Sequence, residues 1–596
     1  MRAIETFPNL VTMFFVRAQE KGDAPFLWRK SGGQWQSQSW AEVARQVAAL
    51  AAALKAQGLK PGDPVMLVSE NRPEFCIADL AIMAAGCVTV PTYTTNTTRD
   101  HQHILTDSGA RAVIVSTAKL AQALMPAVVR SQASFVIGME PLRGAQGTCV
   151  CHVWSDLIAA HASDPAAAVD AVAAGQSAAR NDQACIIYTS GTGGAPRGVM
   201  QHHGAILANV EGAAKVVAED FGWGDEVFLS FLPLSHAYEH SGGQFLPMLL
   251  AGQIYYAEGL EKLASNIEEA RPTIMVVVPR LFEVLRTRII KSIEKQGKFP
   301  TYLLAQALRI AAREQAGRGS ILDLPMKTLL ARTLVPKIRA RFGGRMKALV
   351  SGGAPLNPDV GLFFHAMGLT LLQGYGQTEA GPVISCNRPR AGIAMDTVGP
   401  PLDGVEVKIA EDGEILVRGE LVMHGYWRNP VETEKVLRDG WLHTGDIGEI
   451  DAKGRIRITD RKKDLIVNDK GDNVSPQKVE GMLTLQPEIG QAMVYGDRRP
   501  HLVGLIVPDA EWTRDWAIGQ GVALDSVDTN PAYQAALRAA VDRVNDDLSV
   551  IERVRRFILA DEPFGIENEE MTPSMKIRRH VLRKRYAERL DALYKG

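Results

Sequence analysis

The sequence predicts an α/β fold, with a large N-terminal domain of parallel and mixed sheets covered by helices and a smaller C-terminal α+β domain. Three observations predict it. Apolar runs alternate with helical patterns before Gly404, short strands and turns replace them afterwards, and the chain has 596 residues. A single core stops growing at roughly 250 to 300 residues. We therefore expect several packed units, divided into residues 1–460 and 461–596.

The first predicted helix runs from Ser39 to Leu54. Apolar residues recur there at helical spacing, Ser39 and Glu42 form a capping pair, and Gly58 follows the end. Strand-like runs and a second helical stretch then alternate, as in a parallel sheet covered on both faces. These strands are expected at 65–68, 88–90 and 112–115, and this helix at 73–85.

The alanine-rich stretch 162–180 has no clear apolar stripe, so we expect a connection there. Strand-like runs return at 185–188, 274–278, 349–350 and 370–372, and all but the second soon reach a glycine (Gly191, Gly352 and Gly374). In open α/β sheets, ligands bind beyond the carboxyl ends of strands, where glycine turns let backbone NH groups approach a phosphate. These turns are the predicted binding site.

A hinge is expected near 460–463, after the change of pattern that begins at Gly404. The remainder contains its own strand at 502–507 and helix at 535–548. It is long enough to fold as a small separate domain.

Charge and cysteine content exclude several classes of protein. The 66 Lys and Arg residues nearly balance 67 Asp and Glu residues, so no global field attracts nucleic acid. The six cysteines lack metal-ligand spacing, which indicates reduced thiols. The apolar runs are shorter than the ~20 residues that span a bilayer, and no signal cleavage site follows the N-terminus. We expect a cytoplasmic protein, and leave open its oligomeric state and a peripheral contact with the inner face of the membrane.

The first chemical motif is the segment 188–198, between a predicted strand and a helix expected to start near Val199. Small hydroxyl residues, glycines and Arg197 suit a phosphate cradle. It is not a Walker A loop, because no Gly-Lys-Ser/Thr follows at the required spacing. A flexible surface turn is the alternative.

Two further motifs follow apolar runs. In 373–379, a hydroxyl and a carboxylate stand together at Thr378 and Glu379, which suits a nucleotide with a hard cation. In 351–355, missing side chains would let a flat ring lie against the backbone. Plain turns are the alternative reading of both segments.

Three motifs lie nearer the C-terminus. The segment 440–446 carries a carboxylate, Asp446, between turns, where it could accept ribose hydroxyls or simply cap a helix. Charged residues fill 460–464, and 471–476 follows. Such runs are usually solvated faces. Lys576 lies in the sixth segment, 572–579, where an ordinary surface lysine is the alternative.

In this order and spacing, the six segments resemble the adenylate-forming superfamily of acyl-CoA synthetases, firefly luciferases and peptide-synthetase adenylation domains. The segments 231–239, 341–345 and 460–464 are most similar to those of long-chain fatty acid CoA ligases. The resemblance implies that a fatty acid and ATP form acyl-AMP and pyrophosphate, and that the acyl group then passes to coenzyme A with release of AMP. It also implies Mg²⁺ and a mobile C-terminal lid.

The resemblance assigns the site residues by motif. The pyrophosphate would be held by Thr189, Ser190, Gly191, Thr192, Gly193 and Arg197, and the adenine and its surroundings by Gly352, Gly353, Ala354, Pro355, Gln373, Gly374, Tyr375 and Gly376. Thr378 would contact the α-phosphate, Glu379 with Thr192 the magnesium, and Asp446 with Arg461 the ribose. Lys576 would bridge the acyl carboxylate and the phosphate. The lid would turn about Lys463 and bring Gly471 to Asn473 toward CoA.

Elementary chemistry supports these residue types. A carboxylate that attacks the α-phosphate must overcome repulsion between anions, and fixed cations reduce it. Relatives usually have Thr at Gly193 and Lys at Arg197, but Arg keeps the charge and adds a bidentate fork. His236 is expected either as a gate to the acyl tunnel or as a hydrogen-bonded core histidine.

Two readings of the function stay open beside the CoA ligase. One is an acyl-AMP ligase that loads an acyl carrier protein, and the other is a non-catalytic nucleotide or fatty-acid binding protein. The basic stretches 332–347 and 576–589 could contact anionic lipid or the CoA phosphates, or could be solvated helix faces.

Overall fold

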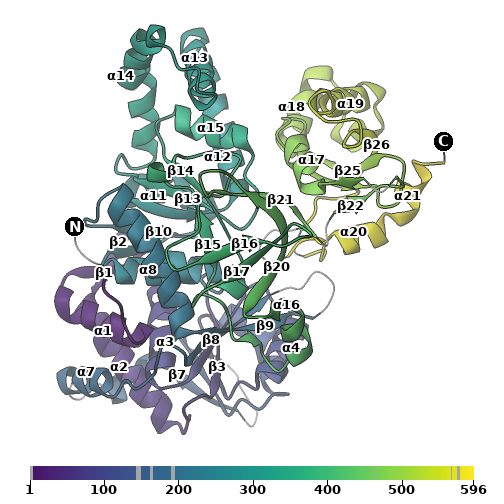
Figure 1. The fold of residues 1–596 in the computed structure, drawn as a ribbon. Coiled ribbons are helices and arrows are strands. Elements are labelled where there is room, and N and C mark those ends of the chain that lie inside the picture. The colour runs from purple at the N-terminus through teal and green to yellow at the C-terminus, as the bar shows by residue number, and fades with distance from the viewer. Residues whose placement is uncertain are drawn as a thin grey trace. The chain divides into compact units, whose positions relative to one another are not determined.

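The computed structural model describes residues 4–142, 149–161, 165–189, 195–462, 465–470, 472–565, 567–572 and 577–595. The chain divides into two compact units (Figure 1). Unit 1 comprises Met1–Ala410, Leu416–Thr444 and Ile450–Arg457, and unit 2 comprises Glu411–Ile415, Gly445–Glu449 and Ile458–Gly596. The domain boundary at 460/461 stays a prediction.

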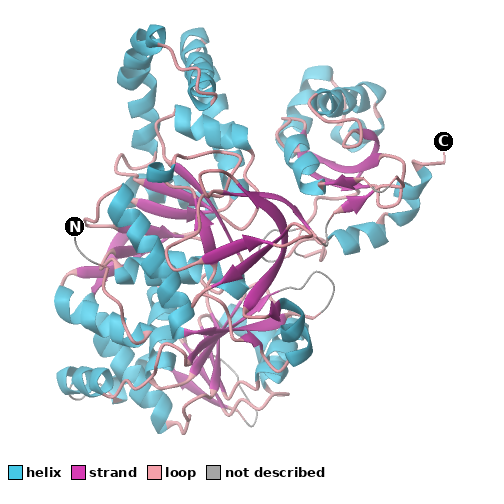
Figure 2. Ribbon diagram, viewed as in Figure 1, coloured by secondary structure: helices cyan, strands magenta, loops and turns pink. Residues whose placement is uncertain are grey.

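Unit 1 contains two eight-stranded sheets, and helices pack around them (Figure 2). The first has the order β18 (Gly425–Tyr426), β9 (Arg197–His202), β8 (Gln183–Thr189), β4 (Val88–Thr92), β3 (Pro64–Val68), β5 (Ala112–Val115), β6 (Phe135–Gly138) and β7 (Val150–Val153). Strands β8 to β7 run parallel, and β9 and β18 are added antiparallel.

The second sheet of unit 1 places the strands that precede most glycine turns side by side. Its order is β15 (Val383–Cys386), β14 (Leu371–Gly376), β13 (Ala348–Ser351), β12 (Ile274–Val277), β10 (Val227–Ser230), β11 (Gln253–Tyr256), β1 (Pro25–Ser31) and β2 (Gln34–Ser39). Strands β14 to β1 are parallel, so the turns after β14, β13, β12 and β10 lie at one edge.

Several helices of unit 1, among them α1, α2, α3 and α8, share a large apolar core with both sheets. Helix α3 (Pro73–Ala84) is buried all round, as expected for a helix in the middle of a large core. The other helices are α1 (Leu10–Lys21), α2 (Trp40–Ala56), α4 (Thr98–Ser108), α5 (Ala118–Val128), α6 (Trp154–Ala160), α7 (Pro165–Ala174), α8 (His203–Asp220), α9 (Ala237–Glu239), the π-helix η1 (His240–Phe245), α10 (Leu246–Leu249), α11 (Leu263–Ala270), α12 (Pro279–Glu294), α13 (Lys298–Gln315), α14 (Leu324–Arg341), α15 (Pro358–Ala366) and α16 (Pro430–Val436), with the 3₁₀ turns η2 (Leu260–Lys262), η3 (Ile321–Asp323), η4 (Thr378–Ala380) and η5 (Pro389–Ala391).

The predicted capping pair of the first long helix is confirmed. The Ser39 hydroxyl accepts the Glu42 backbone NH at 3.2 Å, and the Glu42 carboxylate accepts the Ser39 NH at 2.7 Å. The connection predicted over 162–180 is wrong in part, because Pro165–Ala174 forms α7, which packs against α2. Alanine favours helix wherever a neighbour covers it, even without an apolar stripe of its own.

The helix expected near Val199 is also wrong. Residues Arg197–His202 form β9, which pairs antiparallel with β8 from Thr189↔Arg197 to Gln183↔His202. The helix, α8, begins only at His203. Residues 195 and 196 therefore lead into a strand that pairs with β8, and not into the N-terminus of a helix.

A five-stranded sheet follows along the chain. Its order is β16 (Glu406–Ile409), β17 (Glu414–Arg418), β20 (Trp441–Ile450) and β19 (Leu437–Arg438), and β21 (Ile456–Arg461) also pairs with β20. Asp446, which we expected between turns, lies within β20.

Unit 2 also contains a small α/β core of its own. A three-stranded sheet, β24 (Ile489–Tyr495), β25 (Leu502–Pro508) and β26 (Val554–Leu559), packs against helices. The remaining elements are β22 (Ile466–Val467), β23 (Asn473–Val474), α17 (Pro476–Leu483), α18 (Ala510–Gln520), η6 (Leu524–Thr529), α19 (Pro531–Asp546), α20 (Arg579–Arg585) and α21 (Ala587–Ala592). Within the described ranges, no helix of the chain has the length and apolar character needed to cross a membrane.

Candidate functional site

The carboxyl ends of β10, β12, β13 and β14 bring several predicted motifs to one edge of a sheet. The segment 352–355 follows β13, Thr378 and Glu379 follow β14, and His236 lies shortly after β10. Because these strands are parallel neighbours, the segments that follow them begin next to one another at the same edge of the sheet. This is where open α/β sheets bind ligands.

The turn after β13 rests on an aromatic ring. A Cβ atom added to Gly352 would lie 2.9 Å from Cζ of Tyr238, closer than real Cβ atoms approach. The Tyr238 hydroxyl donates to the backbone oxygen of Val350 at 2.9 Å, and the NH of Gly352 donates to Val277 at 3.1 Å. Gly353 has a φ of +82°, which favours glycine. The chain thus needs glycine at both positions for its own geometry.

Two buried polar atoms, at the end of β13 and in the middle of β14, have no hydrogen-bond partner in the described part of the chain. They are the Ser351 hydroxyl and Oε1 of Gln373, and these residues are register partners. Buried polar groups are nearly always paired, so these two atoms are open to a hydrogen bond from a ligand or a water. Gly374 and Tyr375 follow on β14, and Tyr375 is buried.

Thr378 and Glu379 are held through their backbones. The Gln201 side chain donates to the oxygen of Thr378 at 2.7 Å, and the NH of Met423 donates to the oxygen of Glu379 at 2.9 Å. The Tyr426 hydroxyl donates to Oε1 of Glu379 at 2.8 Å. Burial and then Glu379 raise the pKa of Tyr426, so the phenol keeps its proton and stays a donor.

Tyr426 also connects this carboxylate with the cation of the first motif. The Arg197 guanidinium lies 4.7 Å from the centroid of the Tyr426 ring. It forms an ion pair with Glu432 at 2.6 Å. Thr189 faces Arg197 across the hairpin. Ser190, Gly191, Thr192 and Gly193 lie outside the described residues.

His236 caps the short helix α9, and its Nδ1 accepts the NH of Tyr238 at 3.2 Å. A neutral His236 ring therefore carries its proton on Nε2. The next carboxyl group, Glu239, is 1% exposed, and Ser230 and the backbone of Phe231 lie close enough to lower its pKa. Burial raises the pKa of Glu239 to about 8. Both side chains follow β10, but the gate role of His236 stays a prediction.

In unit 2, Asp446 and Arg461 lie on neighbouring strands. Nε of Arg461 donates to Oδ1 of Asp446 at 3.0 Å, and Asp446 is buried. Beside them, the Glu414 carboxylate accepts the NH of Gly445 at 2.8 Å and pairs with Lys462 at 3.2 Å. The predicted residues Lys463, Gly471 and Lys576 fall outside the described residues, as does the side chain of Asn473.

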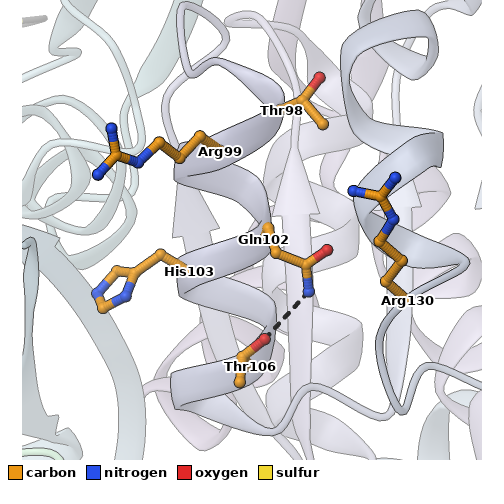
Figure 3. A pocket seen from close by; sticks show the side chains of 6 residues that line it. All are labelled: Thr98, Arg99, Gln102, His103, Thr106 and Arg130. Atoms are coloured by element: carbon orange, nitrogen blue, oxygen red, sulfur yellow. Dashed lines mark hydrogen bonds between the residues drawn. The ribbon is translucent and has the colours of Figure 1, made fainter.

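An open surface pocket of about 600 Å³ lies between α4 and the end of α5 (Figure 3). Its lining residues are Thr98, Arg99, Gln102, His103, Thr106 and Arg130. Nε2 of His103 lies 2.8 Å from the backbone oxygen of Pro196, so α4 contacts the end of the glycine segment. These residues belong to none of the predicted motifs.

Three residues that hold the site together also lie outside the predicted motifs, namely Gln201, Tyr426 and Glu432. Tyr426 belongs to a short Gly-Tyr-Trp segment after the five-stranded region begins, which carries no recognisable chemistry of its own. Only the fold brings these residues to the motifs. Among the described residues, no three His, Cys, Asp or Glu side chains gather as a metal site.

Comparison with known proteins gives a consistent match. The model of the AMP-binding enzyme family matches residues 14–427, and that of the AMP-binding enzyme C-terminal domain matches residues 463–596. The chain is 33% identical to a long-chain-fatty-acid CoA ligase, FadD15, of Mycobacterium tuberculosis, over 98% of this chain and 97% of that protein. It is 30% identical to the peroxisomal long chain acyl-CoA synthetase 6 of Arabidopsis thaliana, over 94% and 82%.

Solved structures show the same fold. The adenylation domain of a carboxylate reductase from Mycobacterium chelonae superposes with a TM-score of 0.79 at 22% identity, over 99% of this chain and 92% of that one. An anthranilate CoA ligase, AuaEII, in complex with anthranoyl-AMP, gives a TM-score of 0.71 at 19% identity, over 98% of both chains.

Proposed function

Because the chain belongs to the AMP-binding family of adenylate-forming enzymes, among its acyl-CoA synthetases, we propose that it joins a long-chain fatty acid to coenzyme A through an acyl-AMP intermediate. ATP supplies the AMP group and leaves pyrophosphate. The observation that carries the proposal is the full-length similarity to two long-chain ligases. The motifs at the strand ends are the site we assign to it.

The residues of unit 1 suit the nucleotide. The glycine turn at 352–355, with the unpartnered Ser351 and Gln373 atoms beside it, offers a flat surface and polar atoms for the adenine. Arg197 and the hydroxyl groups of the hairpin would hold the pyrophosphate. Arg197 is already oriented by the Tyr426 ring, so its positive charge need not be repositioned when phosphate replaces Glu432 as its partner.

Glu379 fits a magnesium ion. One of its oxygens is fixed by Tyr426, and the described residues give its carboxylate no Lys, Arg or His ion-pair partner. Mg²⁺ is usually held by one or two carboxylates together with phosphates and water, so a larger cluster of acids is not needed. Bound there, Mg²⁺ would neutralise phosphate charge. Thr192 is the second ligand that we propose.

Unit 2 would supply the other groups. Asp446, which is buried and accepts a hydrogen bond from Arg461, is the carboxylate that we propose for the ribose hydroxyls. Lys576 would hold the acyl carboxylate against the α-phosphate, because an ammonium offsets the repulsion between these anions. For the second step we propose that Lys463 acts as the hinge and that Gly471 to Asn473 lie near the CoA thiol. The thiolate attacks the acyl carbonyl and AMP leaves, so the protein needs no nucleophile of its own.

The test is an assay of purified protein with ATP, magnesium and acids of short, medium, long and aromatic type. We expect acyl-dependent exchange of pyrophosphate into ATP, and AMP release that requires CoA and is fastest with long-chain acids. Transfer to an acyl carrier protein without CoA would favour the carrier-loading alternative. The absence of pyrophosphate exchange with every acid would refute adenylation altogether. The cytoplasmic location stays a prediction.

A further inference from the structure

The helical hairpin formed by α13, η3 and α14, residues 298–341, differs in charge from the rest of the chain. It contains nine Lys and Arg residues and two acids, whereas the whole chain has a formal net charge of −1. Figure 1 shows α13 and α14 extending beyond the strands of unit 1. A local field this strong is an electrostatic footprint for an anionic surface.

Both acids of the hairpin are used internally. Asp323 pairs with Arg313, and Glu314 pairs with Lys327. Seven cations are left without an acidic partner among the described residues, and all seven are exposed: Lys298, Arg309, Arg318, Arg332, Lys337, Arg339 and Arg341. The hairpin therefore presents its positive charge to its surroundings instead of cancelling it within the fold.

The tip of the hairpin is apolar and uncovered. Ile321 is 88% exposed, Leu322 89% and Leu324 60%. Scattered exposed apolar residues are normal, but three within four positions at the end of a projecting element form a patch. The inner stripe of the hairpin is buried as usual, with Leu304, Ile310 and Leu334 at 5%, 5% and 7% exposed.

We propose that this hairpin docks unit 1 on an anionic lipid bilayer, with Ile321, Leu322 and Leu324 entering the interface and the cations contacting the headgroups. An apolar edge beside Lys and Arg is the composition that binds membrane surfaces. Each cation near an anionic leaflet contributes about 1 kcal/mol, roughly a fivefold gain in partitioning. A nucleic acid would use the cations but would leave the apolar tip without a role.

The docking goes beyond the proposed reaction and needs neither ATP nor CoA. The test is flotation of the full-length protein with vesicles of phosphatidylcholine alone or with phosphatidylglycerol added. We expect binding only to the mixed vesicles, with a steep loss between 50 and 500 mM salt, roughly as Debye screening demands. Equal binding to neutral vesicles, or no binding to either, would overturn the proposal and leave the ligase assignment untouched.

Two pairs of variants separate the two parts of the surface. The double variant Arg332→Glu and Lys337→Glu should lower partitioning by at least about tenfold. Its control reverses Lys55 and Lys60, which are also exposed. The double variant Ile321→Ser and Leu322→Ser should lower partitioning onto the vesicles by about tenfold, because serine side chains gain little from entering the apolar part of the interface. Its control is the double variant Ile518→Ser and Leu524→Ser in unit 2, where these side chains are 74% and 55% exposed.

Folding is checked by thermal unfolding and by ligase activity on a water-soluble medium-chain acid, which should be unchanged in all four variants. Binding losses in the hairpin pairs alone support the proposal. Losses that are equal in hairpin and control pairs would show a diffuse charge effect and would overturn it. So would unchanged binding of the tip variant, which would favour an acidic protein or nucleic acid as the partner of the cations.

Discussion

The two units build their parts of the proposed machinery in opposite ways. In unit 1 the contacts join distant parts of the chain: Arg197 and Glu432 are 235 positions apart, and Gln201 and Thr378 are 177 apart. In unit 2, Arg461 and Asp446 are only 15 positions apart and lie on adjacent strands. The nucleotide groups of unit 1 therefore depend on the whole fold, whereas the pair in unit 2 depends on one strand pairing.

The largest effect is expected for Lys576→Ala, which tests whether unit 2 contributes a group that acts only in acyl-AMP formation. If this ammonium acts only while the acyl carboxylate attacks phosphate, its loss should slow acyl-AMP formation by about 10³-fold, the scale of a lost charge-stabilising group. Thioester formation from supplied acyl-AMP should stay within about threefold of the wild type, because the thiolate step needs no such bridge. Single-turnover measurements of both half-reactions decide it, and equal losses in both would contradict the assigned role.

Glu379→Gln tests the long-range network of unit 1. We expect kcat/KM for MgATP to fall by about 10²-fold, and the magnesium concentration for half-maximal rate to rise, because the amide is a poor ligand for a hard cation. Tyr426→Phe removes only the hydrogen bond to this carboxylate, and should cost about tenfold or less. A magnesium titration that is identical for Glu379→Gln and the wild type would remove Glu379 from the metal site.

Asp446→Asn tests the local pair of unit 2. Loss of a charged acceptor for ribose hydroxyls should raise KM for ATP by about tenfold, with kcat nearly unchanged. The matched control is Asp412→Asn in the same unit, an exposed carboxylate that pairs with Lys462. Similar changes in KM for both variants would show a general charge effect on unit 2, and no role in binding ribose.

The last prediction concerns stability instead of rate, and it returns to unit 1. The pKa of Glu239 is raised from 4.5 to about 8 by burial. Between these values the folded chain keeps a proton that the unfolded chain releases, so stability falls as pH rises through this window, by up to about 1.4 kcal/mol per pH unit. Glu239→Gln, which mimics the neutral acid, should have a flatter profile in urea unfolding from pH 5 to 8. Parallel profiles would show that Glu239 ionises normally.

Helices and strands were predicted correctly from the sequence where the local signals agreed with the tertiary structure. The helix α2 was predicted because Ser39 and Glu42 cap it and its apolar residues follow helical spacing. The errors arose where a partner decided the structure. Helix α7 packs on α2 without a stripe of its own, and β9 is a strand because β8 pairs with it along its length. Such tertiary contacts override local propensity.

The candidate site shows the same division. Thr378 and Glu379 could be found from sequence because a hydroxyl and a carboxylate stand together after an apolar run. Tyr426, which binds Glu379 and packs under Arg197, could not, since its role exists only after β18 pairs with β9. The rule that ligands bind at the carboxyl ends of parallel strands predicted where the site lies. The residues that support the site could be recognised only from the folded structure.

The contact between Gly352 and Tyr238 restricts how this enzyme can change. With the ring 2.9 Å from where a methyl group would stand, alanine at 352 would force the Tyr238 side chain or the turn to shift. A smaller residue at 238 would make room, but it would also leave the Val350 oxygen without its hydroxyl donor. The two positions are therefore coupled: a larger residue at 352 requires a change at 238, and a designer who wants a new base-binding surface here must consider both positions together.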